Sequence, residues 1–354
     1  MSPKAGTEWS PTGPDPVTEA VSLVDRLAER LAALAPGYPD VRLCVAFSGG
    51  MDSVALLHAA RELAGHQPAL SLRAVHVDHG LQPAAVQWAD HCREHCRRLA
   101  VPLEVVELGL EVGKGESVEA EARHERYAAL AARLAPGECL LTAHHADDQL
   151  ETVLLQLFRG AGVAGLAAMP DAAPLGPGLH LRPLLDTARD ELVAYATALG
   201  LEWIEDPMNA EGRYDRAFLR HVVLPAILAR WPSVARTVGR SARHLGEAKR
   251  LLEALARLDG RPLVDGQGRL DIAGLRALPR ERQVNVLRWW MAEQGLGTPS
   301  TARLESILRD VVPARPDAHP VVTWPTGEVR RYRGRLVAGR STGQAAGTEP
   351  GRRD

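Results

Sequence analysis

Ser48-Gly49-Gly50-Met51-Asp52-Ser53 is the most informative stretch of this sequence, because of the segments on either side of it. Residues 41–47 (VRLCVAF) are apolar and β-prone, and residues 54–60 (VALLHAA) have a helical composition without a breaker. The order strand, glycine turn, helix leaves unpaired N–H groups at the helix start, where an anion is stabilised. Two glycines also let the backbone approach a ligand closely. The stretch predicts a phosphate site; the alternative is a serine-glycine turn that only caps the helix.

The turn differs from other common phosphate-binding loops. A Walker loop needs G-x-x-x-x-G-K-[ST], and a dinucleotide fingerprint needs G-x-G-x-x-G. SGGMDS instead resembles the SGGxDS pyrophosphate loop of the ATP pyrophosphatase superfamily, whose members split ATP between its α and β phosphates. The resemblance implies bound ATP. A carboxylate repels phosphates, so Asp52 beside them implies a cation such as Mg²⁺ in between.

The composition is that of an ordinary soluble protein of about two domains. Of its 354 residues, 45% are hydrophobic and 24% are charged. A signal-peptide pattern and an apolar run long enough to span a bilayer are both missing from the sequence, so we expect a cytoplasmic protein without a membrane partner. The four cysteines form no disulfide framework. Residues 91–96 (HCREHC) offer metal ligands on one helical face, but no second pair at zinc spacing follows, which favours packing.

Charge is distributed unevenly behind a formal net charge of −2. Residues 226–354 contain 23 Lys/Arg against 13 Asp/Glu, and residues 1–225 contain 19 against 31. A basic C-terminal part predicts a polyanionic partner. Because nearly all of the basic residues are arginines, a genomic bias is the competing explanation.

Apolar β-prone runs alternate with amphipathic helical stretches over residues 18–225. Besides 41–47, strands are expected at 70–77, 103–108 and 138–143, and helices at 84–99, 117–134, 147–158 and 187–199. The alternation predicts an α/β fold with a doubly wound parallel sheet that is covered on both faces. In such a sheet, ligands bind at the carboxyl ends of the strands.

A change of character after residue 225 predicts a second domain over residues 226–340. It is expected to start with a helical connector at 226–258, broken at Trp231-Pro232, and to continue as a small α/β domain. The expected elements are helices at 270–294 and 301–309 and strands at 321–324 and 328–337. Tryptophans in such a domain are more typical of a core than of a surface that stacks on RNA bases. We expect disordered tails at 1–17 and 341–354.

A second chemical cluster lies in residues 141–152 (LTAHHADDQLET), directly after a predicted strand. If a helix begins near Asp147, then Asp147 and Glu151 share one face and Asp148 lies beside them. Acids at a helix start are favoured by the helix dipole, but capping does not account for the two preceding histidines. The residues leave open helix capping, a metal site and a pocket for a cationic amine.

Further motifs in the same order make the resemblance specific. They are residues 76–81 (HVDHGL), 122–127 (ARHERY), 143–152 (AHHADDQLET), 159–166 (RGAGVAGL), 182–185 (RPLL), 203–209 (WIEDPMN) and 216–220 (RAFLR). With SGGMDS they are similar to tRNA(Ile)-lysidine synthetase over residues 40–225, and the remainder matches in outline. The resemblance implies a PP-loop ATPase domain of the adenine nucleotide alpha hydrolase type over 18–225 and a tRNA-binding domain over 226–340.

The same resemblance implies a carbon-nitrogen ligase that uses ATP and Mg²⁺. ATP adenylates the wobble cytidine in the CAU anticodon of tRNA(Ile) and releases pyrophosphate. The ε-amine of free L-lysine then displaces AMP. The product, lysidine, switches decoding from AUG to AUA. The sequence leaves open how methionine tRNA is rejected and whether the chain forms a homodimer.

Residues of several motifs receive a role from the resemblance. The implied ATP contacts are Ser48, Gly49, Gly50, Met51, Asp52, Ser53, His76, Arg123 and Gly162. The implied catalytic residues are Asp52, which also holds Mg²⁺, Arg123, His144, Asp147, Asp148 and Glu151. The last three carboxylates are expected to bind the ammonium groups of lysine, and His144 or His145 to relay its proton.

Arg216 and Arg220 lie four residues apart and are expected to meet tRNA. Met208 and Ala217 depart from the family pattern, which has Ser and Asn there, and both lie in the segment that is expected to face tRNA.

Three other functions compete with this one. A tRNA cytidine thiolation enzyme has a similar loop and HHxDD block, but it uses CxxC pairs, and no CxxC occurs here. An amidating synthetase needs an ammonia source and leaves the basic C-terminal part unexplained. A non-catalytic RNA-binding relative does not require the intact SGGMDS turn and acidic block.

Overall fold

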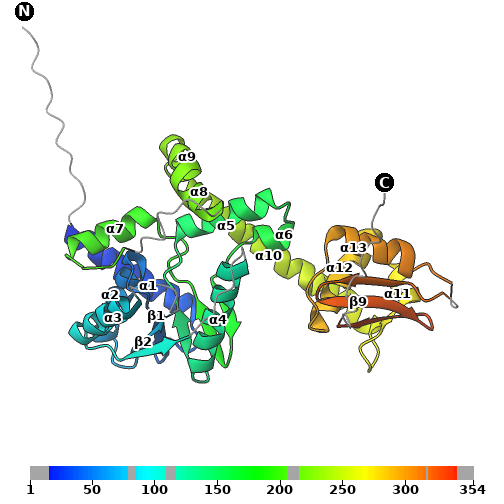
Figure 1. The fold of residues 1–354 in the computed structure, drawn as a ribbon, viewed down its shortest axis with the longest axis horizontal. Helices are drawn as coiled ribbons and strands as arrows, with labels where there is room; N and C mark the ends of the chain where they lie inside the picture. The colour runs from blue at the N-terminus through cyan, green and yellow to red at the C-terminus, as the bar shows by residue number, and fades with distance from the viewer. Residues whose placement is uncertain (1–15, 79–84, 109–116, 206–214, 316–317, 341–354) are drawn as a thin grey trace, which may run out of the picture. The chain divides into compact units, whose positions relative to one another are not determined.

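The computed structural model describes residues 16–78, 85–108, 117–205, 215–315 and 318–340 (Figure 1). The chain divides into two compact units, Met1–Gly246 and Glu247–Asp354. The division falls inside helix α10 (Val234–Gly260), beyond the predicted domain boundary at 225/226. Helix α1 (Pro16–Leu34) already includes the last two residues of the predicted N-terminal tail. The rest of that tail, the tail at 341–354 and Met208 lie outside the described residues.

A six-stranded sheet in the order β3-β2-β1-β4-β6-β5 forms the centre of the first unit. Its strands are β1 (Arg42–Ala46), β2 (Ser71–Asp78), β3 (Leu103–Glu107), β4 (Cys139–Leu141), β5 (Ala172–Leu175) and β6 (Gly178–Leu181). Neighbours from β3 to β6 are parallel, and β5 runs antiparallel to β6. The predicted α/β fold with a parallel sheet is confirmed.

The edge hairpin β5–β6 was not predicted from the sequence. Its first strand reads Ala-Ala-Pro-Leu, without the β-branched residues that mark a strand, and its turn is Gly176-Pro177. Gly176 has φ +53°, and a Cβ there would lie 2.8 Å from the carbonyl oxygen of Ala131. Tertiary packing therefore stabilises the hairpin, and local strand propensity does not predict such packing.

Helices cover both faces of this sheet. Successive side chains of β1 point to opposite faces, and both sets are mostly apolar, so each face needs a covering layer. Leu43 and Val45 pack in a core cluster with residues of α1, α2, α3 and α7. Cys44 faces the other way and packs with Leu130 and Leu134, at and just after the end of α4. The helices are α2 (Met51–His66), α3 (Ala85–Arg98), α4 (Ser117–Arg133), α5 (Ala146–Phe158), α6 (Val163–Leu166), α7 (Arg189–Ala198) and α8 (Asp215–Phe218). The four predicted helices between 84 and 199 are confirmed to within two residues at each end.

The predicted break in the connector is confirmed. The π-helical turn η2 (Leu219–Val223) continues into α9 (Leu224–Arg230), which ends just before Trp231-Pro232, and α10 follows. Among the described residues, no helix is both long and apolar enough to cross a membrane.

The second unit contains an antiparallel sheet in the order β7-β10-β9-β8. Its elements after α10 are η3 (Arg261–Leu263), β7 (Leu270–Asp271), α11 (Ile272–Ala277), α12 (Arg280–Glu293), α13 (Thr301–Ser306), η4 (Ile307–Val311), β8 (Val321–Trp324), β9 (Gly327–Tyr332) and β10 (Arg335–Gly339). Helices and sheet share one apolar core, in which Trp290 is fully buried. This burial supports the core role of that tryptophan.

Two predictions for this unit were wrong in detail. The predicted helix 270–294 is a short strand and two helices, because Pro279 interrupts it. The predicted strand 328–337 is a hairpin that turns at Arg333-Gly334, where φ is +44° and +76°. Two successive residues with positive φ form a tight turn, and arginine gives no sequence signal for one.

Candidate active site

The SGGMDS turn connects β1 to α2 at the carboxyl end of the parallel sheet. Gly49 has φ +81°, and a Cβ there would lie 3.0 Å from Sγ of Cys92. Ser53 Oγ donates to the carbonyl oxygen of Gly50 at 2.9 Å and lies 3.1 Å from Oγ of Ser48. Gly50 is the N-cap of the 16-residue helix α2, so the turn ends at unpaired helical N–H groups. Its geometry suits a phosphate group.

His76 lies behind this turn. Nδ1 of His76 is 2.8 Å from the carbonyl oxygen of Phe47, so the ring donates to the residue directly before Ser48. The side chain is 5% exposed, and burial lowers its pKa, which keeps it neutral. Cys92 lies 3.5 Å from the same nitrogen and is buried in the core together with Cys96 and Phe47. This burial supports the packing role of the HCREHC cysteines.

His145 lies among three carboxylates at the start of α5. Its Nε2 is 3.7 Å from Oδ1 of Asp52 and 3.4 Å from Oδ2 of Asp148, and its Nδ1 is 3.6 Å from Oδ2 of Asp147. These are ion-pair distances rather than hydrogen bonds. Burial lowers the pKa of His145, but the three carboxylates outweigh burial and raise that pKa to about 10. His145 is therefore an imidazolium at neutral pH, and it joins the SGGMDS turn to the acidic block.

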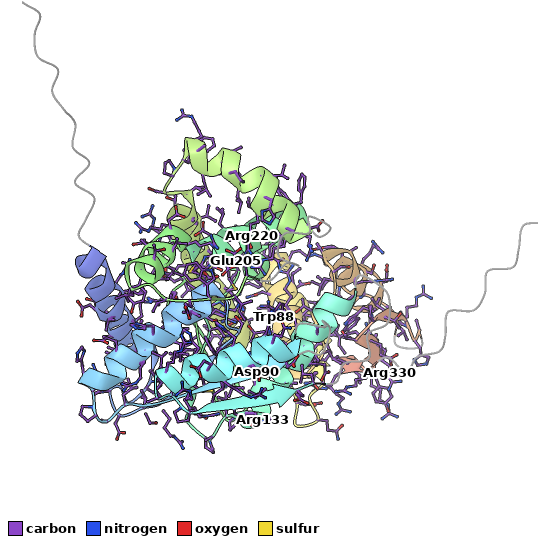
Figure 2. All side chains as sticks on the ribbon, turned by 60° about the vertical axis from the view of Figure 1, so that its left-hand side comes forward. Trp88, Asp90, Arg133, Glu205, Arg220 and Arg330 are labelled. Carbon is purple, nitrogen blue, oxygen red and sulfur yellow. The ribbon has the colours of Figure 1, made fainter. Side chains whose placement is uncertain are left out.

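Glu151 and Asp148 are paired with the two predicted tRNA residues. Glu151 is 1% exposed and accepts from Nε of Arg216 and from Nε of Arg220, both at 2.7 Å. Nη2 of the same arginines lies 3.4 Å and 3.2 Å from Oδ1 of Asp148. Arg220 is labelled in Figure 2 and comes from η2. The structure thus brings the predicted lysine site and the predicted tRNA residues into one ionic cluster, which the sequence did not reveal.

His144 belongs to a different network, at the end of β4. Oγ1 of Thr142 lies 2.8 Å from Nδ1 of His144 and 2.8 Å from Nε2 of His180. Nδ1 of His180 lies 3.1 Å from Nη2 of Arg182. Burial, followed by the charges of Arg182 and Arg123, lowers the pKa of His144 to about 2, and burial and Arg182 lower that of His180 to about 3.

The sequence motifs predict no role for Thr142 or His180, and none for Arg182 beyond its place in the motif at 182–185. His180 lies on β6, and the parallel pairing of β4 with β6 places it beside Leu140. Because the hairpin was not predicted, the residues around His180 in the sequence do not indicate that it lies next to β4.

Arg123 lies near this network from the side of α4. Its guanidinium carbon is 5.3 Å from the ring centroid of Tyr127, and that ring is 5.3 Å from the ring of His180. The structure places Gly162 at the N-cap of α6, where a Cβ would meet nothing within 4 Å.

Asp52 fits the Mg²⁺ that the fold implies. Its Oδ1 is a buried oxygen without a hydrogen-bond partner in the described part of the chain. Burial raises its pKa, but His145, Arg189 and Arg220 together lower it, so the carboxylate is ionised. Across the described residues, no group of three or more His, Cys, Asp or Glu side chains is arranged to hold a metal ion. A Mg²⁺ ion held by one carboxylate and by substrate phosphates matches this donor set.

Comparisons with known proteins find relatives that match both parts of the chain. A family model described as PP-loop domain matches residues 23–227, and a model described as TilS substrate binding domain matches residues 270–337. The tRNA(Ile)-lysidine synthase of Alkalilimnicola ehrlichii is 48% identical over 88% of this chain and 69% of that protein. The corresponding synthase of Coxiella burnetii is 46% identical over 83% of this chain and 65% of that protein. That of Pseudomonas aeruginosa is 44% identical over 90% and 72%. This chain therefore spans about two thirds of the length of these relatives.

A solved structure supports the fold. The U34-tRNA thiolase NcsA from Methanococcus maripaludis, solved with its 4Fe-4S cluster, aligns with a TM-score of 0.54 at 17% identity. The alignment covers 64% of this chain and 80% of that one. At this identity the likeness concerns the fold alone.

Proposed function

This chain belongs to the tRNA(Ile)-lysidine synthase family, and we propose that it ligates free L-lysine onto the wobble cytidine of the CAU anticodon of tRNA(Ile). In this reaction ATP is converted to AMP and pyrophosphate. One observation carries the proposal: the phosphate-binding turn after β1 and the acidic block after the neighbouring strand β4 meet through Asp52 and His145, 3.7 Å apart. The proposed site for the leaving pyrophosphate and the proposed site for the ammonium groups of lysine thus lie side by side.

The adenylation step uses the SGGMDS turn. The N–H groups at the start of α2 and the hydroxyls of Ser48 and Ser53 receive the β and γ phosphates. Mg²⁺, when bound at Asp52, neutralises charge on these phosphates. Arg123 supplies a fixed positive charge for the α-phosphate. His76 holds the carbonyl of Phe47 and so keeps the start of the turn in place.

The lysine step uses the carboxylates of α5, which differ in exposure and in the partners that they already have. Asp147 is 18% exposed and accepts one backbone N–H, from Arg189, at 2.9 Å. Glu151 is 1% exposed and already paired with two arginines. We therefore assign the direct ammonium contact to Asp147, a shared contact to Asp148, and to Glu151 the task of holding Arg216 and Arg220 at the edge of the lysine site.

The second unit is proposed to bind the tRNA. Residues 226–354 carry 23 Lys/Arg against 13 Asp/Glu, and the match to a substrate-binding family model lies in this region. The phosphate backbone of tRNA is the polyanion that such a surface fits. Arg216 and Arg220 would meet the anticodon side of the same RNA.

Cytidine thiolation is less well supported. An iron–sulfur cluster is held by cysteine thiolates at short spacing. All four cysteines of this chain are buried and free, and those on β1 and β4 point into separate core clusters. These positions give no cluster site.

A direct assay tests the proposal. The purified chain is incubated with ATP, Mg²⁺, labelled lysine and a tRNA(Ile) transcript with a CAU anticodon; a transcript with U34 serves as control. We expect label in the first RNA alone, together with pyrophosphate. Binding of tRNA without label or pyrophosphate would point to a non-catalytic relative and overturn the proposal.

A further inference from the structure

A chain of four side chains crosses from β6 to the end of β4 beside the proposed ATP site. It runs from Arg182 through His180 and Thr142 to His144, with separations of 3.1, 2.8 and 2.8 Å. Arg182, His180 and Thr142 are buried, whereas His144 is half-buried. The network therefore ends at the side chain that a ligand can reach.

Arginine fixes the donor and the acceptor of each hydrogen bond in this side-chain network. A guanidinium only donates hydrogen bonds, so Nδ1 of His180 accepts and its proton lies on Nε2. That Nε2–H donates to Oγ1 of Thr142. Among the described residues, Nδ1 of His144 is the acceptor that lies within reach of the threonine O–H, so this O–H donates to Nδ1 of His144. Nδ1 of His144 carries no proton as a result, and the neutral ring has its proton on Nε2.

Arg182, the first residue of this network, is itself held in place by hydrogen bonds. Nη1 of Arg182 donates to the carbonyl oxygen of Pro170 at 2.8 Å. The backbone N–H of Arg182 donates to the carbonyl oxygen of Asp171, also at 2.8 Å. The backbone N–H of Thr142 donates to the carbonyl oxygen of Leu181 at 3.2 Å, which joins the ends of β4 and β6. The orientation of every group is thus set by the fold before any substrate binds.

The surroundings of His144 are positive. Arg182, Arg123 and Arg216 all act on its ring through their charge, and these charges, after burial, hold its pKa far below the usual range. Such a field attracts an anionic oxygen and repels an ammonium group. The carboxylates that suit lysine lie instead around His145.

We infer that Thr142, His180 and Arg182 are positioning residues that hold His144 as a neutral imidazole with its proton on Nε2. His144 then donates a hydrogen bond to an anionic phosphate oxygen of ATP and does not take the proton from lysine. The inference rests on the proposed function for the identity of that oxygen, whereas the position of the proton follows from the network alone.

Nitrogen NMR of the full chain tests the position of the proton without substrate. In the ¹⁵N-histidine-labelled protein, His144 is assigned by the signals lost in His144→Gln. We expect a protonated Nε2 and an unprotonated Nδ1. Removal of the hydroxyl in Thr142→Val should produce a mixture of tautomers, and Thr142→Ser should restore the single form. A protonated Nδ1 in the wild type, or an unchanged tautomer in Thr142→Val, would overturn the inference.

Kinetics provide the second readout. Thr142→Val should slow tRNA-dependent pyrophosphate release about tenfold in kcat, the loss expected for one hydrogen bond, with Thr142→Ser near the wild type. The pH profile of lysine transfer in His144→Gln should keep its rising limb; loss of that limb would make His144 the base and overturn the inference. An enzyme that shows the expected tautomer but transfers no lysine would instead contradict the proposed function alone.

Discussion

Nε of Arg216 lies 2.7 Å from Oε2 of Glu151, a carboxylate that is 1% exposed. The two residues are 65 positions apart in the chain, and Arg220 contacts the other oxygen of the same carboxylate. The pairing ties the segment before α9 to the helix that carries the acidic block. Residues proposed to contact two different substrates are therefore electrostatically coupled in the protein alone.

Removing the charge of Glu151 should be costly. Glu151→Gln leaves two guanidinium groups facing each other, with Asp148 as their remaining acidic partner. Because the arginines are 31% and 37% exposed, we expect a loss of about 2–3 kcal/mol in the free energy of unfolding, below the range for fully buried pairs. Urea denaturation measures it. Glu94→Gln, which breaks exposed pairs with Arg97 and Arg98, is the control and should leave the midpoint unchanged. Equal effects of the two variants would refute the buried-pair account.

Gly49 should not tolerate a side chain. In Gly49→Ala the left-handed φ of +81° costs about 1–2 kcal/mol, and the new Cβ would lie 3.0 Å from Sγ of Cys92. We expect that calorimetric titration will detect no ATP binding to this variant and that its melting temperature will be lower. Gly266→Ala, at a glycine with open space around it, is the matched control. Undiminished ATP affinity in Gly49→Ala would contradict the role of the turn.

His145 should make stability depend on pH on the alkaline side. Its folded-state pKa of about 10 lies above the ordinary histidine value of 6.5, so its ion pairs stabilise the fold fully below pH 6.5 and are lost as pH rises through 10. Without ATP or Mg²⁺, the difference in unfolding free energy between wild type and His145→Gln should shrink by about 1 kcal/mol per pH unit between these values. A difference that is constant or grows with pH would show that His145 is neutral in the folded protein.

The second unit should contribute to the salt dependence of tRNA binding. Arg330, labelled in Figure 2, and Arg333 are exposed on the β9–β10 hairpin, inside the region that matches the substrate-binding family model. If each contacts a phosphate, replacing both with alanine should lower the slope of log affinity against log salt by about 1.5–2. Arg309→Ala, whose side chain is paired with Asp310, serves as control and should leave the slope unchanged. An unchanged slope in the double variant would exclude this surface from the RNA contact.

The catalytic half of the fold could be predicted because its signals are local. A β-prone run, two glycines and a helical run specify strand, turn and helix, and the parallel order of β1 and β4 then brings the two motifs together. The residues that orient them could not be predicted in this way. His180 meets Thr142 through a hairpin with a weak strand signal, and Glu151 meets Arg216 through tertiary packing. Each pair is set by contacts that residue spacing does not encode.

Mass spectrometry of the RNA can detect the proposed product at the wobble position. After incubation with ATP, Mg²⁺ and lysine, a tRNA(Ile) transcript is digested to nucleosides and the wobble position is analysed. We expect cytidine joined to lysine with loss of one water, and none of this product from Asp52→Ala. An unmodified cytidine after incubation with the wild-type enzyme would contradict the proposal.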